Sequence, residues 1–65
     1  MESLTQYPKA CRESIRRITD ILGTCAETAY AMILMTAALM DLRPEDDLVV
    51  EYIFRDCGIM LEQPD

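Results

Sequence analysis

The sequence predicts an all-α protein, a three-helix bundle with a mostly apolar central helix, packed as a homodimer. Apolar residues recur at helical spacing in three segments: residues 8–22, residues 25–41, and residues 44–57 or as far as 61. No segment alternates polar and apolar residues as a strand does, and no Asn-Gly or Asp-Gly hairpin turn occurs. The 65 residues are 51% apolar, which is typical of a globular chain rather than a disordered one.

The first predicted helix covers residues 8–22. Pro8 suits a first helical turn, and Gly23 is a common helix stop. One arc of this helix is charged and includes the candidate basic face, which consists of Lys9, Arg12 and Arg16. An acidic partner could meet this face, and the alternative is a solvated surface. The opposite arc is apolar and is expected to be buried: Ala10, Cys11, Ile15, Ile18, Ile21 and Leu22.

The second predicted helix, residues 25–41, contains an uncharged run from residue 28 to residue 40. Thr24 and Glu27 have the spacing of a capping box at its start. A helix that is apolar nearly all round has to be covered nearly all round, and Ile33 is expected at its buried centre. Only a narrow stripe around Leu34 and Ala38 is predicted to face outward. A chain of this length buries only about 60% of the surface that its unfolded form exposes, so the other two helices cannot cover every side of this one. The apolar arc that they leave uncovered predicts self-association, through Met32, Met35, Leu39 and Leu42.

The third predicted helix starts at Pro44, with the acids at 45–47 near the positive end of the helix dipole. It ends at 57, or at 61 if it passes through Gly58, which the in-phase residues 60 and 61 favour. A small apolar stripe on its charged side predicts a surface for a partner. The residues of this candidate contact are Leu48, Tyr52, Arg55 and Ile59. The alternative is that the two aliphatic side chains only fold over the helix ends.

Short connections predict that consecutive helices run antiparallel. That arrangement would bring Cys25 and Cys57 to the same end, so they are the pair to test for a disulfide. Three scattered cysteines without any histidine do not make a structural zinc site. We therefore expect reduced, buried or half-buried thiols, with no metal and no cofactor. A reactive Cys25 at a helix N-terminus is the alternative.

The composition argues against most chemistry. The chain has no histidine and no glycine-rich phosphate loop, and a bundle this small offers little room for a substrate cleft. We therefore expect that the protein is not an enzyme. A net charge of −6 disfavours nucleic acid and anionic membranes. The uncharged run is too short to cross a bilayer, and the N-terminus does not resemble a signal peptide. We expect one cytoplasmic domain over residues 1–65, frayed at 1–6 and 62–65.

These observations predict a small acidic helical interaction module. It would bind and modulate a larger protein as an adaptor, a chaperone, an anti-activator or an inhibitor. Methionine side chains form adaptable apolar surfaces, and docking of a helix in a groove is the expected mode of contact. The alternative function is that of a small dimeric nucleic-acid-associated regulator, which would use the basic face of the first helix.

Overall fold

The computed structural model describes residues 3–58 and contains three α-helices. A short 3-10 turn, Lys9–Cys11, leads into α1 (Arg12–Leu22), which is followed by α2 (Ala26–Met40) and α3 (Asp47–Asp56). No strand occurs within residues 3–58. The predicted all-α, three-helix arrangement is therefore confirmed, and packing as a homodimer stays a prediction.

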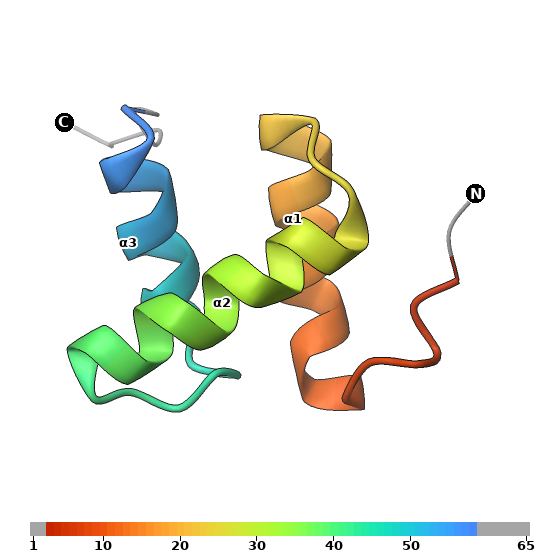
Figure 1. Cartoon of the computed structure of the whole chain (residues 1–65), viewed down its shortest axis with the longest axis horizontal. Helices are drawn as coiled ribbons and strands as arrows, with labels where there is room; N and C mark the ends of the chain where they lie inside the picture. The colour runs from red at the N-terminus through yellow and green to blue at the C-terminus, as the bar shows by residue number, and fades with distance from the viewer. Residues whose placement is uncertain (1–2, 59–65) are drawn as a thin grey trace, which may run out of the picture.

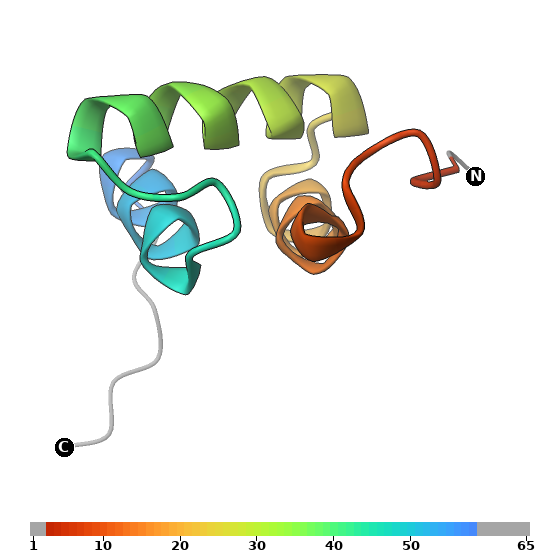
Figure 2. The same ribbon diagram turned by 90° about the horizontal axis from the view of Figure 1, so that it is seen from below.

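The three helices form two layers. Helices α1 and α3 lie in one layer, and α2 crosses over both of them (Figure 1, Figure 2). The chain bends by 113° between Lys9–Leu22 and α2. The predicted antiparallel packing is wrong, because a three-residue turn that contains glycine can also make a corner of about 90–120° between helices. Since α2 begins beside α1 while α3 ends on the other side of the molecule, the fold does not favour a Cys25–Cys57 disulfide.

The core lies between the two layers. Helix α2 contributes mainly small side chains, so α1 and α3 can approach it closely, and Ile33 is fully buried at its centre, as predicted. Phe54 is the largest of the fully buried side chains. The buried apolar residues are Cys11, Ile15, Ile18, Ala26, Ala29, Ile33, Ala37, Val49, Val50, Ile53 and Phe54. The buried arc of α1 is narrower than predicted, since Ile21 is 49% exposed and Ala10 is also exposed.

The start of α1 is later than the sequence predicts. Pro8 is extended, with φ −55° and ψ 136°, and its carbonyl accepts a hydrogen bond from the Cys11 N–H at 2.9 Å. The chain therefore passes through the 3-10 turn before α1 begins at Arg12. Gly23 ends α1 as predicted, in the left-handed conformation at φ 72°, and its N–H donates to the Thr19 carbonyl at 2.9 Å.

The predicted capping box at the start of α2 does not form. Cys25, not Thr24, occupies the N-cap position, and no side-chain hydrogen bond caps the helix. The Thr24 hydroxyl oxygen is buried and finds no hydrogen-bond partner within residues 3–58. The capping geometry failed because α2 starts one residue later than the capping box requires.

The connection between α2 and α3 is longer than predicted, because α3 does not start at Pro44. The Asp46 N–H donates to the Arg43 carbonyl at 2.9 Å, so residues 43–46 make a turn. The Asp46 carboxylate then accepts from the Leu48 N–H at 2.9 Å and caps the helix that begins at Asp47, a role for which aspartate is among the preferred residues.

Helix α3 ends at Asp56. Gly58 adopts φ 77°, which is outside the helical range, so the predicted passage of the helix through Gly58 is wrong. Residues 59–61, over which that extension was predicted, lie outside the described residues.

Asp41 ends α2 in an unfavourable conformation, and we expect Asp41→Gly to stabilise the protein. Its φ of 56° is left-handed, which costs residues with a Cβ about 1 kcal/mol. Its carboxylate also lies at the negative end of the helix dipole. We expect the free energy of unfolding in urea to rise by about 0.5–1 kcal/mol.

Gly23→Ala is the matched control for this prediction. Gly23 has the same left-handed backbone, and an added Cβ there would meet no atom within 4 Å. Any loss must then come from the backbone conformation, and we expect a loss of about 1 kcal/mol. Unchanged stability in Asp41→Gly would contradict the argument.

Candidate functional site

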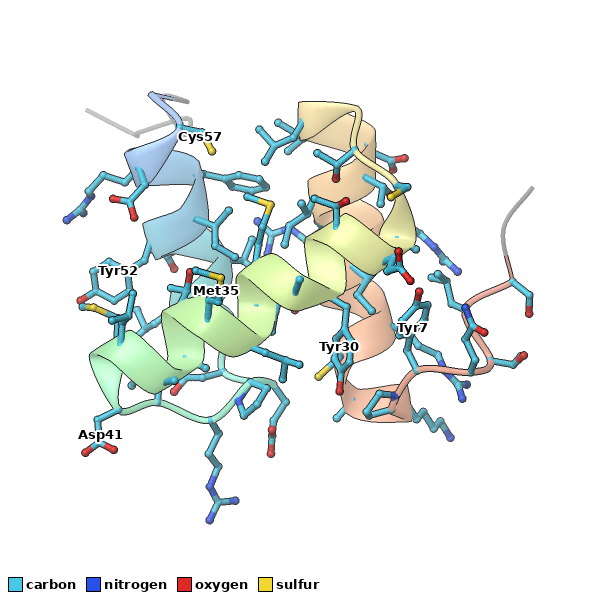
Figure 3. All side chains as sticks on the ribbon, viewed as in Figure 1. Tyr7, Tyr30, Met35, Asp41, Tyr52 and Cys57 are labelled. Carbon is cyan, nitrogen blue, oxygen red and sulfur yellow. The ribbon has the colours of Figure 1, made fainter. Side chains whose placement is uncertain are left out.

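The side of α2 that faces away from α1 and α3 is apolar and exposed. Met35 is 66% exposed and Leu39 is 80% exposed, while Leu34 is 42% exposed. Figure 3 shows Met35 projecting from α2 on the side away from the other helices. We call this surface the α2 outer face and define it by its exposed apolar residues, which are Ala31, Leu34, Met35, Ala38 and Leu39.

The α2 outer face has the spacing of a helix–helix contact. Each of its members has another member three or four residues away, which places them in one stripe along the helix. No charged side chain interrupts the stripe between Glu27 and Asp41. Exposed apolar stripes of this kind mark interaction sites more often than scattered apolar residues do.

The four predicted self-association residues divide into two groups. Met35 and Leu39 lie on the α2 outer face, whereas Met32 and Leu42 are half-buried and pack against the core. The predicted outward stripe was too narrow, because the other two helices both lie on the same side of α2. The opposite side of α2 is therefore uncovered. Its residues include Leu34 and Ala38, which are not among the four predicted self-association residues.

The predicted partner stripe on α3 is on the surface. Leu48 is 45% exposed, and the Arg55 guanidinium carbon lies 5.8 Å from the centre of the Tyr52 ring, which is within the range of a cation–π contact. Tyr52 is half-buried and projects away from α1 (Figure 3). Ile59, the fourth predicted member, lies outside the described residues.

The three residues of the predicted basic face differ in exposure. Arg12 is half-buried, and its guanidinium donates to the Tyr7 carbonyl at 3.1 Å and to the Thr5 carbonyl at 3.2 Å. Arg12 therefore ties the N-terminal segment to α1, while Lys9 and Arg16 are exposed. The Tyr7 and Tyr30 rings meet edge to face, with centroids 5.1 Å apart, as the labelled rings in Figure 3 illustrate.

This N-terminal segment forms one wall of an open groove. Leu4, within the stretch 1–6 for which fraying is predicted, packs partly against the core. The groove has a volume of about 520 Å³ and runs between this segment, α1 and the start of α2. This groove was not predicted from the sequence, since nothing in the spacing of Thr5, Thr19 and Thr24 indicates that they line one surface.

The cysteines differ from one another in exposure. Cys11 is buried, as predicted, but Cys25 and Cys57 are exposed. Burial raises the pKa of the Cys11 thiol above its usual 9.0, and the Glu45 carboxylate adds to the effect. The stability linked to this shift is fully present below pH 9.0 and is lost as the pH rises through the raised value. The Cys25 sulfur lies 3.2 Å from the Thr28 hydroxyl, and no group of three metal-ligating side chains occurs within residues 3–58.

We expect Cys25 and Cys57 to react with iodoacetamide well before Cys11 in the native protein at pH 8. The thiolate is the reactive form, so burial and the raised pKa both protect Cys11. Peptide mapping by mass spectrometry gives the three rates separately. In urea all three thiols should react at comparable rates. A native Cys11 that reacts as fast as the other two would contradict its placement in the core.

Comparison with known proteins adds no relative. No family model matches the chain, and no similar protein was found among the curated proteins or the solved structures. Within residues 3–58, no single helix is long and apolar enough to cross a membrane; Lys9–Leu22 and α2 meet that test only together, across their 113° bend. The candidate site therefore rests on the geometry of this chain.

Proposed function

We propose that this protein is a protein–protein interaction module whose main contact is the α2 outer face. The observation that carries the proposal is a continuous uncharged surface on which Met35 and Leu39 are 66% and 80% exposed. Leaving such a surface in water is unfavourable by roughly 25 cal/mol per Å² of apolar area. A partner that covers it recovers that free energy, and helix-in-groove or helix-on-helix docking suits its shape.

A second copy of the chain is the first partner that fits. A two-fold contact centred on Leu34 and Met35 would place Ala31 of one copy near Ala38 of the other, and small residues there allow close approach of the helices. Such a self-complementary patch is what a two-fold dimer needs.

A larger protein is the second partner in this proposal. The stripe of Leu48, Tyr52 and Arg55 on α3 would remain outside an α2–α2 contact and could serve it. Tyrosine and arginine are enriched among residues that dominate interface energies. Acting through this stripe, the protein would work as an adaptor, chaperone, anti-activator or inhibitor. Its exposed thiols suit the reducing cytoplasm, where we place it.

Protein binding ranks above nucleic-acid binding in this proposal. Arg12 donates two hydrogen bonds to the N-terminal segment and is half-buried, so only Lys9 and Arg16 of the basic face are exposed. Two cations repeated in a dimer give few phosphate contacts, and the net charge of −6 opposes them.

Size-exclusion chromatography with light scattering, in reductant and over a range of concentrations, tests the proposal. We expect a mass near twice the 7.4 kDa of one chain. Wild-type protein and a Tyr52→Asp variant would then each be immobilised, and the proteins that bind to them compared. We expect a protein that binds to the wild type and not to the variant. The proposal would be overturned if the wild type is a monomer at every concentration and also binds no other protein.

A further inference from the structure

The groove beside the N-terminal segment lies apart from the α2 outer face and combines apolar wall with polar and charged side chains. It is about 520 Å³ in volume, within the size range of ligand-binding pockets. Two guanidinium groups, those of Arg12 and Arg16, line it from α1. Thr24 lines it from the turn before α2, and Leu4 and Ala26 add apolar wall.

The Arg12 side chain is held in place before any ligand arrives. Its Nε and one terminal nitrogen donate to the Tyr7 and Thr5 carbonyls. An arginine has five N–H donors in a rigid fork, so donors on its terminal nitrogens remain for a ligand in the groove. A fixed donor loses less conformational entropy on binding than a mobile one does.

Two further donors at the groove have no partner to satisfy them. The Arg16 guanidinium makes no hydrogen bond or ion pair within residues 3–58, although the Arg16 backbone carbonyl accepts from the Thr19 hydroxyl at 2.9 Å. The Thr24 hydroxyl is buried and, within the same part of the chain, has no partner. A buried hydroxyl without a partner costs roughly 1–3 kcal/mol. A local movement of the turn that opens this hydroxyl to the groove would let a ligand oxygen supply the missing bond.

We propose that this groove binds a carboxylate group, presented either by an acidic side chain of a peptide or by a small aliphatic monocarboxylate. Arginine suits carboxylates because its planar fork can donate two parallel hydrogen bonds. The Thr24 hydroxyl would donate to the same group or to its neighbour. The apolar wall at Leu4 and Ala26 matches the aliphatic stem that carries a carboxylate.

The charges around the groove favour a singly charged group over phosphate. Asp20 lines the same groove, and its carboxylate would repel a dianion more strongly than a monoanion. The chain as a whole carries −6, which weakens binding of polyanions such as nucleic acid.

Titration followed by amide NMR shifts tests the proposal. The probes are butyrate and a capped Ala-Leu-Glu-Ala peptide, with capped Ala-Leu-Gln-Ala, inorganic phosphate and a DNA duplex as comparisons. We expect saturable shifts around Arg16 and Thr24, with Kd on the order of 1 mM. Binding of both carboxylates identifies the shared group, whereas binding of the peptide alone identifies a polypeptide as its source. Tighter binding of phosphate or of a DNA duplex than of either carboxylate would overturn the proposal.

Matched variants separate a built site from general electrostatic attraction. Arg16→Gln should raise Kd by about tenfold or more, since it removes a charge-assisted hydrogen bond. Arg17→Gln changes the net charge equally, but Arg17 lies over the Phe54 ring and outside the groove, so its Kd should stay within about twofold. Thr24→Val keeps the side-chain shape and should weaken binding without unfolding the protein. Equal weakening by Arg16→Gln and Arg17→Gln, or no saturable binding, would overturn the proposal.

Discussion

Ile33→Asp is expected to abolish folding. Ile33 is fully buried at the centre of α2, between the layer formed by α1 and α3 and the helix backbone. An aspartate there would be a buried charge without a partner, which costs several kcal/mol or forces the carboxyl to take up a proton. A chain of 65 residues has a total stability of only roughly 3–10 kcal/mol. The substitution therefore removes most or all of that stability.

Met35→Asp is the matched comparison. It makes the same kind of change two residues further along α2, where the side chain is 66% exposed. Surface substitutions change stability by about 0.5 kcal/mol, so this variant should remain helical and unfold cooperatively. Circular dichroism with urea titration distinguishes the two. A helical, cooperative Ile33→Asp protein would show that α2 is not the buried centre.

The second large expected effect is on association rather than on folding. Met35→Asp should weaken self-association by about a hundredfold or more, because each of two copies would bring an uncompensated charge into an apolar contact. Sedimentation equilibrium of the wild type and the variant gives the ratio of dissociation constants. Light scattering over the same concentrations would show the variant as a monomer.

Ala10→Asp is the control for net charge. Ala10 is exposed in the 3-10 turn before α1, away from the α2 outer face, and its change adds the same charge to the chain. We expect its association to match the wild type at 0.15 M salt, where surface charges are screened beyond about 8 Å. Equal association of Met35→Asp and the wild type would show that self-association does not use the α2 outer face.

The sequence alone was enough to predict the three helices and their main buried side chains. Ile15, Ile18 and Ile33 were all expected inside and are buried. The helix ends were predicted less well. Pro44 and Thr24 are residue types that suit helix starts, but Asp46 and Cys25 occupy the N-cap positions. The start of a helix also depends on the register that its packing against the other helices imposes.

The candidate sites could be predicted only in part. Met35 and Leu39 were expected on a contact surface and are exposed, while Met32 and Leu42 from the same set pack against the core. Period alone cannot separate these residues, since a helix that is apolar all round gives no preferred direction. The groove was not predictable, because its lining comes from three segments that periodicity does not relate to one another.

The sequence by itself determined the fold class, the approximate helices, the charge balance and the lack of histidine and of a glycine-rich loop. Each of these follows from local periodicity and composition. The tertiary structure decided which side of α2 is left uncovered. A three-residue turn after α1 allows either an antiparallel hairpin or a corner, and only long-range packing selects between them. With the corner chosen, α1 and α3 share one side of α2, which places Met35 and Leu39 in solvent and brings Arg12, Arg16 and Thr24 around one groove.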